Sequence, residues 1–137
     1  MGMDLRIVLL RWSPLMLSLL RIIAALLFLE HGTQKLFGFP PPPSPAGALP
    51  LLSQIQGLIE FGGGLLLALG LFTRPVAFIL AGDMAVAYFM AHAPQSFFPV
   101  LNRGDAAILY CFIFLYLWFA GGGAWSLDAL RRRAAAP

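Results

Sequence analysis

The sequence predicts an all-α integral membrane protein, an antiparallel, up-down four-helix bundle with both termini in the cytoplasm. Of its 137 residues, 60% are hydrophobic and only 11% are charged, far below the quarter that is typical of soluble domains. The apolar residues form continuous runs rather than the alternating pattern of a β-barrel. Arginines gather on the side of the predicted bundle that holds both termini, which indicates that this side is cytoplasmic.

Four spans are expected within a single membrane domain, residues 1–137. They are predicted at about 14–37, 51–72, 75–91 and 105–120, and a basic cytoplasmic tail follows at 124–137. Ser13 and Pro14 predict the start of the first span, because a capping hydroxyl precedes a proline at the first helical position. No small-residue cleavage site follows this span, so we expect it to be an uncleaved helix rather than a signal peptide.

The segments between the spans are rich in proline. Residues 40–45 predict a stiff, extended loop, because four consecutive prolines cannot form a helix. Residues 92–103 are apolar enough to enter the membrane interface. Pro75 is expected to open the third helix, and Asp105 to cap the fourth.

Two patterns within the spans predict how the helices face their surroundings. Small residues repeat every four positions along the third span and favour close approach of a neighbouring helix; they are Ala77, Ala81 and Ala85. Aromatic residues crowd the fourth span, and we expect them to face lipid and the membrane interface; they are Tyr110, Phe112, Phe114, Tyr116, Trp118 and Phe119.

Basic residues set the predicted orientation. Lys35 and Arg103 fall on the outer side. The cytoplasmic side is richer in arginine, with Arg6, Arg11, Arg74, Arg131, Arg132 and Arg133. These residues do not form a stripe with interleaved aromatic side chains, so the lipid bilayer is the expected partner and nucleic acid is not.

Ionisable side chains inside the spans are costly and usually face a bundle interior or a water-filled cavity. Arg21 and Asp83 fall at similar depths, and we predict that they form a structural ion pair. Ten polar residues gather toward the outer ends of the helices and predict a pocket open to the outside, walled by the first two helices and lidded by the two proline-containing loops. These residues are Glu30, His31, Gln34, Lys35, Gln56, Glu60, His92, Asn102, Arg103 and Asp105.

Structural roles remain open for the two strongest pocket candidates. Lys35 would then snorkel to the membrane surface, and Glu60 would hydrogen-bond a neighbouring helix. His31 and His92 lie on different helices and could in principle ligate one haem, but nothing else in the sequence supports haem. With one cysteine, Cys111, and two histidines, neither paired-thiol redox chemistry nor a metal site is expected, and no catalytic residue is assigned.

Several short glycine-containing or charged motifs follow one another along the chain. They are residues 31–38 (HGTQKLFG), 60–64 (EFGGG), 69–74 (LGLFTR), 102–105 (NRGD), 121–123 (GGG) and 126–128 (SLD). In this order, and with four predicted spans, they resemble the DoxX family of small bacterial membrane proteins. The resemblance covers roughly residues 14–130, and the positions that match the family pattern are Gly32, Lys35, Gly38, Glu60, Gly63, Arg74, Gly104 and Asp105. The proline-rich loop at 40–45 looks longer than the family pattern.

The resemblance implies a multi-pass protein of the bacterial cytoplasmic (inner) membrane. It implies a membrane subunit of a quinone-linked or redox-stress oxidoreductase system, with a quinone as ligand and a soluble or membrane-bound redox protein as partner. Such a subunit would not be catalytic alone. The alternatives are a non-catalytic scaffold or assembly subunit, or a small-molecule binder or transporter, for which no inverted repeat is visible. Oligomerisation stays open.

Overall fold

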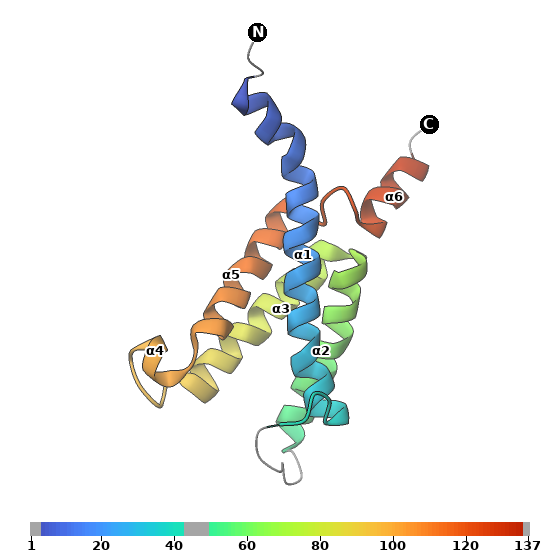
Figure 1. Ribbon diagram of the computed structural model, residues 1–137. Helices are drawn as coiled ribbons and strands as arrows, with labels where there is room; N and C mark the ends of the chain where they lie inside the picture. The colour runs from blue at the N-terminus through green and yellow to red at the C-terminus, as the bar shows by residue number, and fades with distance from the viewer. Residues whose placement is uncertain (1–3, 43–49, 136–137) are drawn as a thin grey trace.

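The computed structural model describes residues 4–42 and 50–135, and these residues form helices without any strand. Along the chain the helices are α1 (Leu5–Phe37), α2 (Leu51–Leu69), α3 (Thr73–Ala87), the π-helix η1 (Tyr88–His92), α4 (Pro99–Asn102), α5 (Asp105–Ala120) and α6 (Leu127–Ala134). The first turns of α1 lie at the same end of the molecule as α6 (Figure 1). The second half of the predicted proline-rich loop, residues 43–45, lies outside the described residues.

Three helices are long and apolar enough to cross a membrane: Leu5–Phe37, Leu51–Leu69 and the continuous Thr73–His92. The fourth predicted span coincides with α5, which is apolar but has only 16 residues. α1 packs mainly against α2, and α3 packs mainly against α5. Large apolar side chains point outward along all these helices, as Ile23, Leu58, Phe89 and Leu109 do. Such a surface suits contact with lipid rather than water.

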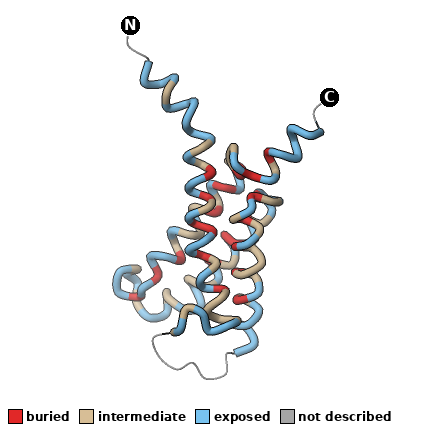
Figure 2. Tube along the Cα trace, turned by 45° about the vertical axis from the view of Figure 1, so that its right-hand side comes forward, coloured by how far each residue is buried: buried red, intermediate tan, exposed pale blue. Residues whose placement is uncertain are grey.

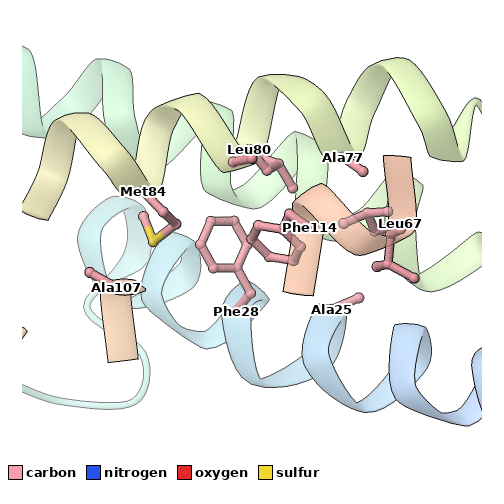
Figure 3. Close-up of a cluster of buried hydrophobic side chains, with 10 residues drawn as sticks. Ala25, Phe28, Leu67, Ala77, Leu80, Met84, Ala107 and Phe114 are labelled. Atoms are coloured by element: carbon pink, nitrogen blue, oxygen red, sulfur yellow. The ribbon is translucent and has the colours of Figure 1, made fainter. Parts of the chain in front are cut away.

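Buried residues concentrate where the helices pack together, whereas the first turns of α1 and most of α6 are exposed (Figure 2). At the centre of the core, Phe28 and Phe114 meet edge to face with ring centroids 4.9 Å apart (Figure 3). Ala77 and Ala81 are buried in the same cluster, as the small-residue pattern predicts.

The prediction that all the aromatic residues of α5 face lipid is wrong for two of them. Phe114 is fully buried in the core, and Tyr110 is half-buried beside Phe28 with ring centroids 5.4 Å apart. The other four are exposed: Phe112, Tyr116, Trp118 and Phe119. Hydropathy alone could not separate the two groups, because α5 is apolar on every face.

The predicted start of the first helix is also wrong. α1 begins at Leu5, and the Asp4 carboxylate caps it by accepting a hydrogen bond from the Arg6 N–H (3.0 Å). Pro14 lies inside the helix, and the Ser13 hydroxyl donates to the carbonyl of Leu9 (2.9 Å) rather than capping. An internal proline removes one backbone hydrogen bond and bends a helix without necessarily ending it, and α1 changes direction in this stretch (Figure 1).

Three other details differ from the prediction. α2 ends at Leu69 rather than near residue 72, and α3 begins at Thr73 rather than Pro75. α5 takes Gly104 as its N-cap, so Asp105 is its first residue and not its cap. The basic tail folds as α6, whose N-cap is Ser126; the serine hydroxyl accepts a hydrogen bond from the Ala129 N–H (3.1 Å).

Candidate functional site

Glycines bring α1 and α2 together near the C-terminal end of α1. A Cβ atom at Gly32 would lie 2.5 Å from the backbone nitrogen of Phe61, and one at Gly57 would lie 3.0 Å from the Cβ of Lys35. Small residues allow this close approach between membrane helices. The side chains next to the contact, Lys35 on α1 and Glu60 on α2, are therefore placed against each other.

Lys35 and Glu60 form an ion pair across this contact. The Lys35 ammonium nitrogen lies 2.7 Å from Oε1 of Glu60, and the two side chains are 26% and 2% exposed. The second carboxylate oxygen, Oε2, is buried and has no hydrogen-bond partner among the described residues. A charge-assisted hydrogen bond of this length is stronger than a neutral one, yet one acceptor oxygen of the pair has no partner among the described residues.

The pair lines a cavity of about 350 Å³, a volume typical of small-molecule sites. Six of the ten residues predicted for the polar pocket line it: His31, Lys35, Gln56, Glu60, His92 and Arg103. The remaining wall is apolar or aromatic and was not predicted: Phe28, Met84, Ala87, Ala91, Ala106, Ala107 and Tyr110. Side chains from α1, α2, α3, η1 and α5 thus enclose the cavity, instead of the first two helices alone.

The other four predicted residues do not line this cavity. Glu30 and Asp105 are exposed. Gln34 donates from Nε2 to the carbonyl of Pro40 (3.1 Å) and so holds the chain that follows α1. Asn102 is fully buried and structural: Nδ2 donates to the carbonyl of Ser96 (2.8 Å) and Oδ1 accepts from the Gly104 N–H (2.8 Å).

The two histidines line the cavity from different helices, His31 from α1 and His92 from η1. The ring of His31 meets that of Tyr110 edge to face with centroids 6.2 Å apart. Nδ1 of His92 is hydrogen-bonded to the carbonyl of Asn102 (2.9 Å), and its ring stacks on Tyr88. His92 thus joins η1 to the turn before α5. Within residues 4–42 and 50–135, no three His, Cys, Asp or Glu side chains cluster as a metal site would need.

The predicted ion pair between Arg21 and Asp83 does not form. Asp83 instead lies close to Gln56, Glu60 and Lys35, whose charges and dipoles act on its carboxylate. With Gln56 it borders a separate groove of about 490 Å³, which is otherwise mostly apolar, and its buried Oδ2 has no hydrogen-bond partner among the described residues. The prediction paired the two residues because they lie at similar depths along their helices. Depth does not determine the direction in which a helix points each side chain.

Arg21 is satisfied by backbone carbonyls rather than by a carboxylate. Its fully buried guanidinium donates to the carbonyls of Gly122 (2.8 Å), Leu67, Ala68 (2.7 Å) and Trp125. Two of these carbonyls close the C-terminal end of α2, and the other two belong to the turn after α5. The side chain therefore ties three parts of the chain together by filling acceptors that a helix end leaves open.

The chain is similar to proteins of a known family. The sequence profile of the DoxX family matches residues 16–93, more than half of the chain. The chain belongs to the DoxX family. The match contains Lys35 and Glu60 of the ion pair but ends before Arg103 and Tyr110, so part of the cavity wall lies beyond the segment that the DoxX profile covers.

Two relatives extend the similarity over most of the chain. An uncharacterized protein of Haemophilus influenzae is 45% identical over 124 residues, which cover 86% of this chain and 92% of the relative. An uncharacterized membrane protein of Mycobacterium tuberculosis is 34% identical over 137 aligned positions, covering 85% and 82% of the two chains. No solved structure matches. This DoxX chain is thus a membrane protein whose relatives carry no stated activity.

Proposed function

We propose that this DoxX protein is a membrane subunit of a quinone-linked or redox-stress oxidoreductase system and that its outer cavity receives a quinone headgroup. The observation that carries the proposal is the Lys35–Glu60 pair on the cavity wall, with Oε2 of Glu60 unpartnered among the described residues. The family resemblance supports a redox role, which we assign to the subunit together with a partner protein.

The cavity chemistry suits a quinone in both of its redox states. A quinone presents carbonyl acceptors on a flat apolar ring, and a quinol presents hydroxyl donors at the same positions. The Lys35 ammonium can donate to a quinone oxygen, and the free oxygen of Glu60 can accept from a quinol hydroxyl. Phe28, Met84 and Tyr110 supply an apolar and aromatic wall for the ring.

The proposal also needs an orientation in the membrane. We propose that α5 completes a four-span, up-down bundle within a single membrane domain of a bacterial inner membrane, with both termini in the cytoplasm. At ~1.5 Å per residue, 16 helical residues span ~24 Å of a ~30 Å hydrocarbon core, and the turns at either end supply the rest. Support comes from six arginines at the end of the molecule that holds α6, against Lys35 and Arg103 at the other end. A reporter that is active only in the cytoplasm should therefore be active when it is fused to the C-terminus.

Purification from the native membrane tests the proposed function. We expect a bound quinone to be extracted from the wild-type protein and identified by mass spectrometry, together with a co-purifying redox protein. The matched control is Asp105→Asn, which alters an exposed carboxylate outside the cavity and should keep the quinone. Retention of quinone by Glu60→Gln at the wild-type level would contradict the assigned site.

A structural role is the second candidate, and one observation favours it. Lys35 and Glu60 already satisfy each other's charge at the α1–α2 contact, as a pair that only holds two helices together would do. A scaffold or assembly subunit would then bring partner proteins to the membrane without binding quinone. Co-purification of partners without any quinone, in both the wild type and Glu60→Gln, would favour this candidate.

A further inference from the structure

A hollow at the opposite end of the molecule is independent of the proposed quinone site. It has a volume of about 950 Å³ and is formed where the middle of α1, the start of α3, the end of α5 and α6 come together. Among the described residues, Arg74, Arg132 and Arg133 line it, and no aspartate or glutamate side chain does. The described wall of the hollow therefore presents three guanidinium groups without a carboxylate side chain beside them.

These arginines make no direct polar contact with the described residues. Arg74, Arg132 and Arg133 donate no hydrogen bond there, and no described carboxylate lies within ion-pairing distance of them. Asp128 attracts Arg132 and lines a smaller neighbouring hollow, which shares Arg74 and Arg132 with the first. The two carboxylate oxygens of Asp128 accept hydrogen bonds from the N–H groups of Phe72 (2.9 Å) and Thr73 (2.8 Å), at the start of α3.

The hollow has an apolar side as well as a basic one. Leu17 lies one turn deeper along α1 than Ser13 and Pro14, and Tyr116 lies one turn deeper along α5 than Ala120. Both residues line the same hollow, on the side nearer the centre of the helices. A ligand seated here would meet guanidinium groups at one end and the apolar surface of two membrane helices at the other.

We propose that this hollow binds the phosphate of an anionic phospholipid, with its acyl chains running along α1 and α5. Guanidinium groups are well suited to phosphate, because their planar donors can bind two oxygens at once. The combination of basic and apolar walls favours a lipid over a free phosphate ion. The arginines that α6 contributes would then hold a lipid in place, in addition to marking the cytoplasmic side.

Native mass spectrometry of the full chain in detergent tests the proposal, with phosphatidylglycerol as the probe and phosphatidylcholine as the zwitterionic comparison. We expect phosphatidylglycerol to be retained in preference to phosphatidylcholine. Arg132→Gln with Arg133→Gln should weaken retention by about tenfold per guanidinium lost. The matched control is Arg6→Gln with Arg11→Gln, which removes the same charge from exposed residues outside the hollow and should change retention less than twofold.

Three results would overturn the proposal. The first is an equal loss of lipid in the control pair, because binding would then reflect diffuse surface charge. The second is displacement of phosphatidylglycerol by equimolar inorganic phosphate, because the hollow would then take a free ion. The third is unchanged retention in the double variant. If that variant fails to fold, Arg74→Gln on α3 removes a guanidinium from the same wall and is judged by the same outcomes.

Discussion

Lys35 reaches from α1 to Glu60 on α2, and its ammonium nitrogen lies 2.7 Å from the carboxylate at a point where Gly32 lets the two backbones touch. The pair is asymmetric, because the Lys35 side chain is partly exposed whereas the Glu60 side chain is almost completely buried. This asymmetry makes the pair a sensitive probe of the site, since the two partners should respond differently to loss of the other.

Lys35→Met should destabilise the protein more than Glu60→Gln. The first change leaves a carboxylate that is only 2% exposed without its cation, and breaking a buried pair in this way typically costs ~3–5 kcal/mol. The second change leaves an ammonium group that can reach water, so we expect a loss below ~2 kcal/mol. Unfolding in mixed detergent micelles measures both values. An equal loss in the two variants would show that Glu60 is not buried as described.

Gly32→Ala should separate α1 from α2 beside the ion pair. The new Cβ would lie 2.5 Å from the nitrogen of Phe61, and forcing an extra carbon into a packed contact typically costs ~1–3 kcal/mol. The matched control is Gly62→Ala on α2, where a Cβ would meet nothing within 4 Å. Alanine should stabilise the helix there by ~0.5–1 kcal/mol. Similar unfolding free energies for both variants would argue against the close helix contact.

Arg21 and Asp83 should behave as independent residues in a double-mutant cycle. Arg21→Gln should cost ~3 kcal/mol or more, because carbonyls of α2 and of the turn after α5 lose a charged donor. Asp83→Asn should leave that cost unchanged, since residues that share no partner add within ~0.5 kcal/mol. A large coupling energy between the two substitutions would contradict this prediction and support the ion pair that the sequence predicts.

Acid should weaken the attachment of α6 to the start of α3. Burial alone would raise the pKa of Asp128, but the backbone hydrogen bonds that it accepts from Thr73 and Phe72 outweigh burial and hold the pKa below its usual 3.8. A lowered pKa in the folded state contributes stability above the unfolded pKa and loses it as the pH falls through the folded value. Wild-type stability should therefore fall below about pH 4, and Asp128→Asn should reduce this slope.

Comparison with Asp105→Asn controls for the general effect of acid. Asp105 is an exposed carboxylate and accepts no hydrogen bond from a described backbone N–H. This variant should keep the wild-type slope of stability against pH. If Asp105→Asn and Asp128→Asn flatten the slope equally, the hydrogen bonds at the start of α3 do not set the acid response.

Hydropathy and charge predict much of the fold. Continuous apolar runs place α2 and α5 within a few residues, because burial in lipid needs length and little else. The start of α1 was missed because apolar residues precede Pro14 and allow the helix to run through it. The helix α6 was missed because residues 127–134 are too short and too polar to signal a span, although Ser126 is a good N-cap residue.

The sequence also predicts part of the site, namely the depth at which each polar residue lies. Depth along each helix brings Lys35 and Glu60 to one level, so their meeting could be anticipated from the sequence. The direction in which each helix points its side chains could not be anticipated. This direction places Asp83 beside Gln56 and Tyr110 in the cavity wall. These choices depend on packing between distant segments, which neither hydropathy nor charge encodes.

Titration of a short-chain ubiquinone analogue into purified protein tests the central claim most directly. The account predicts saturable binding to the wild type and to Asp105→Asn, and binding at least about tenfold weaker to Glu60→Gln, because a charged hydrogen-bond acceptor is lost. Thermal unfolding of each sample shows that the fold is retained. Equal affinity of wild type and Glu60→Gln, or no binding by any folded sample, would contradict a quinone site at the Lys35–Glu60 pair.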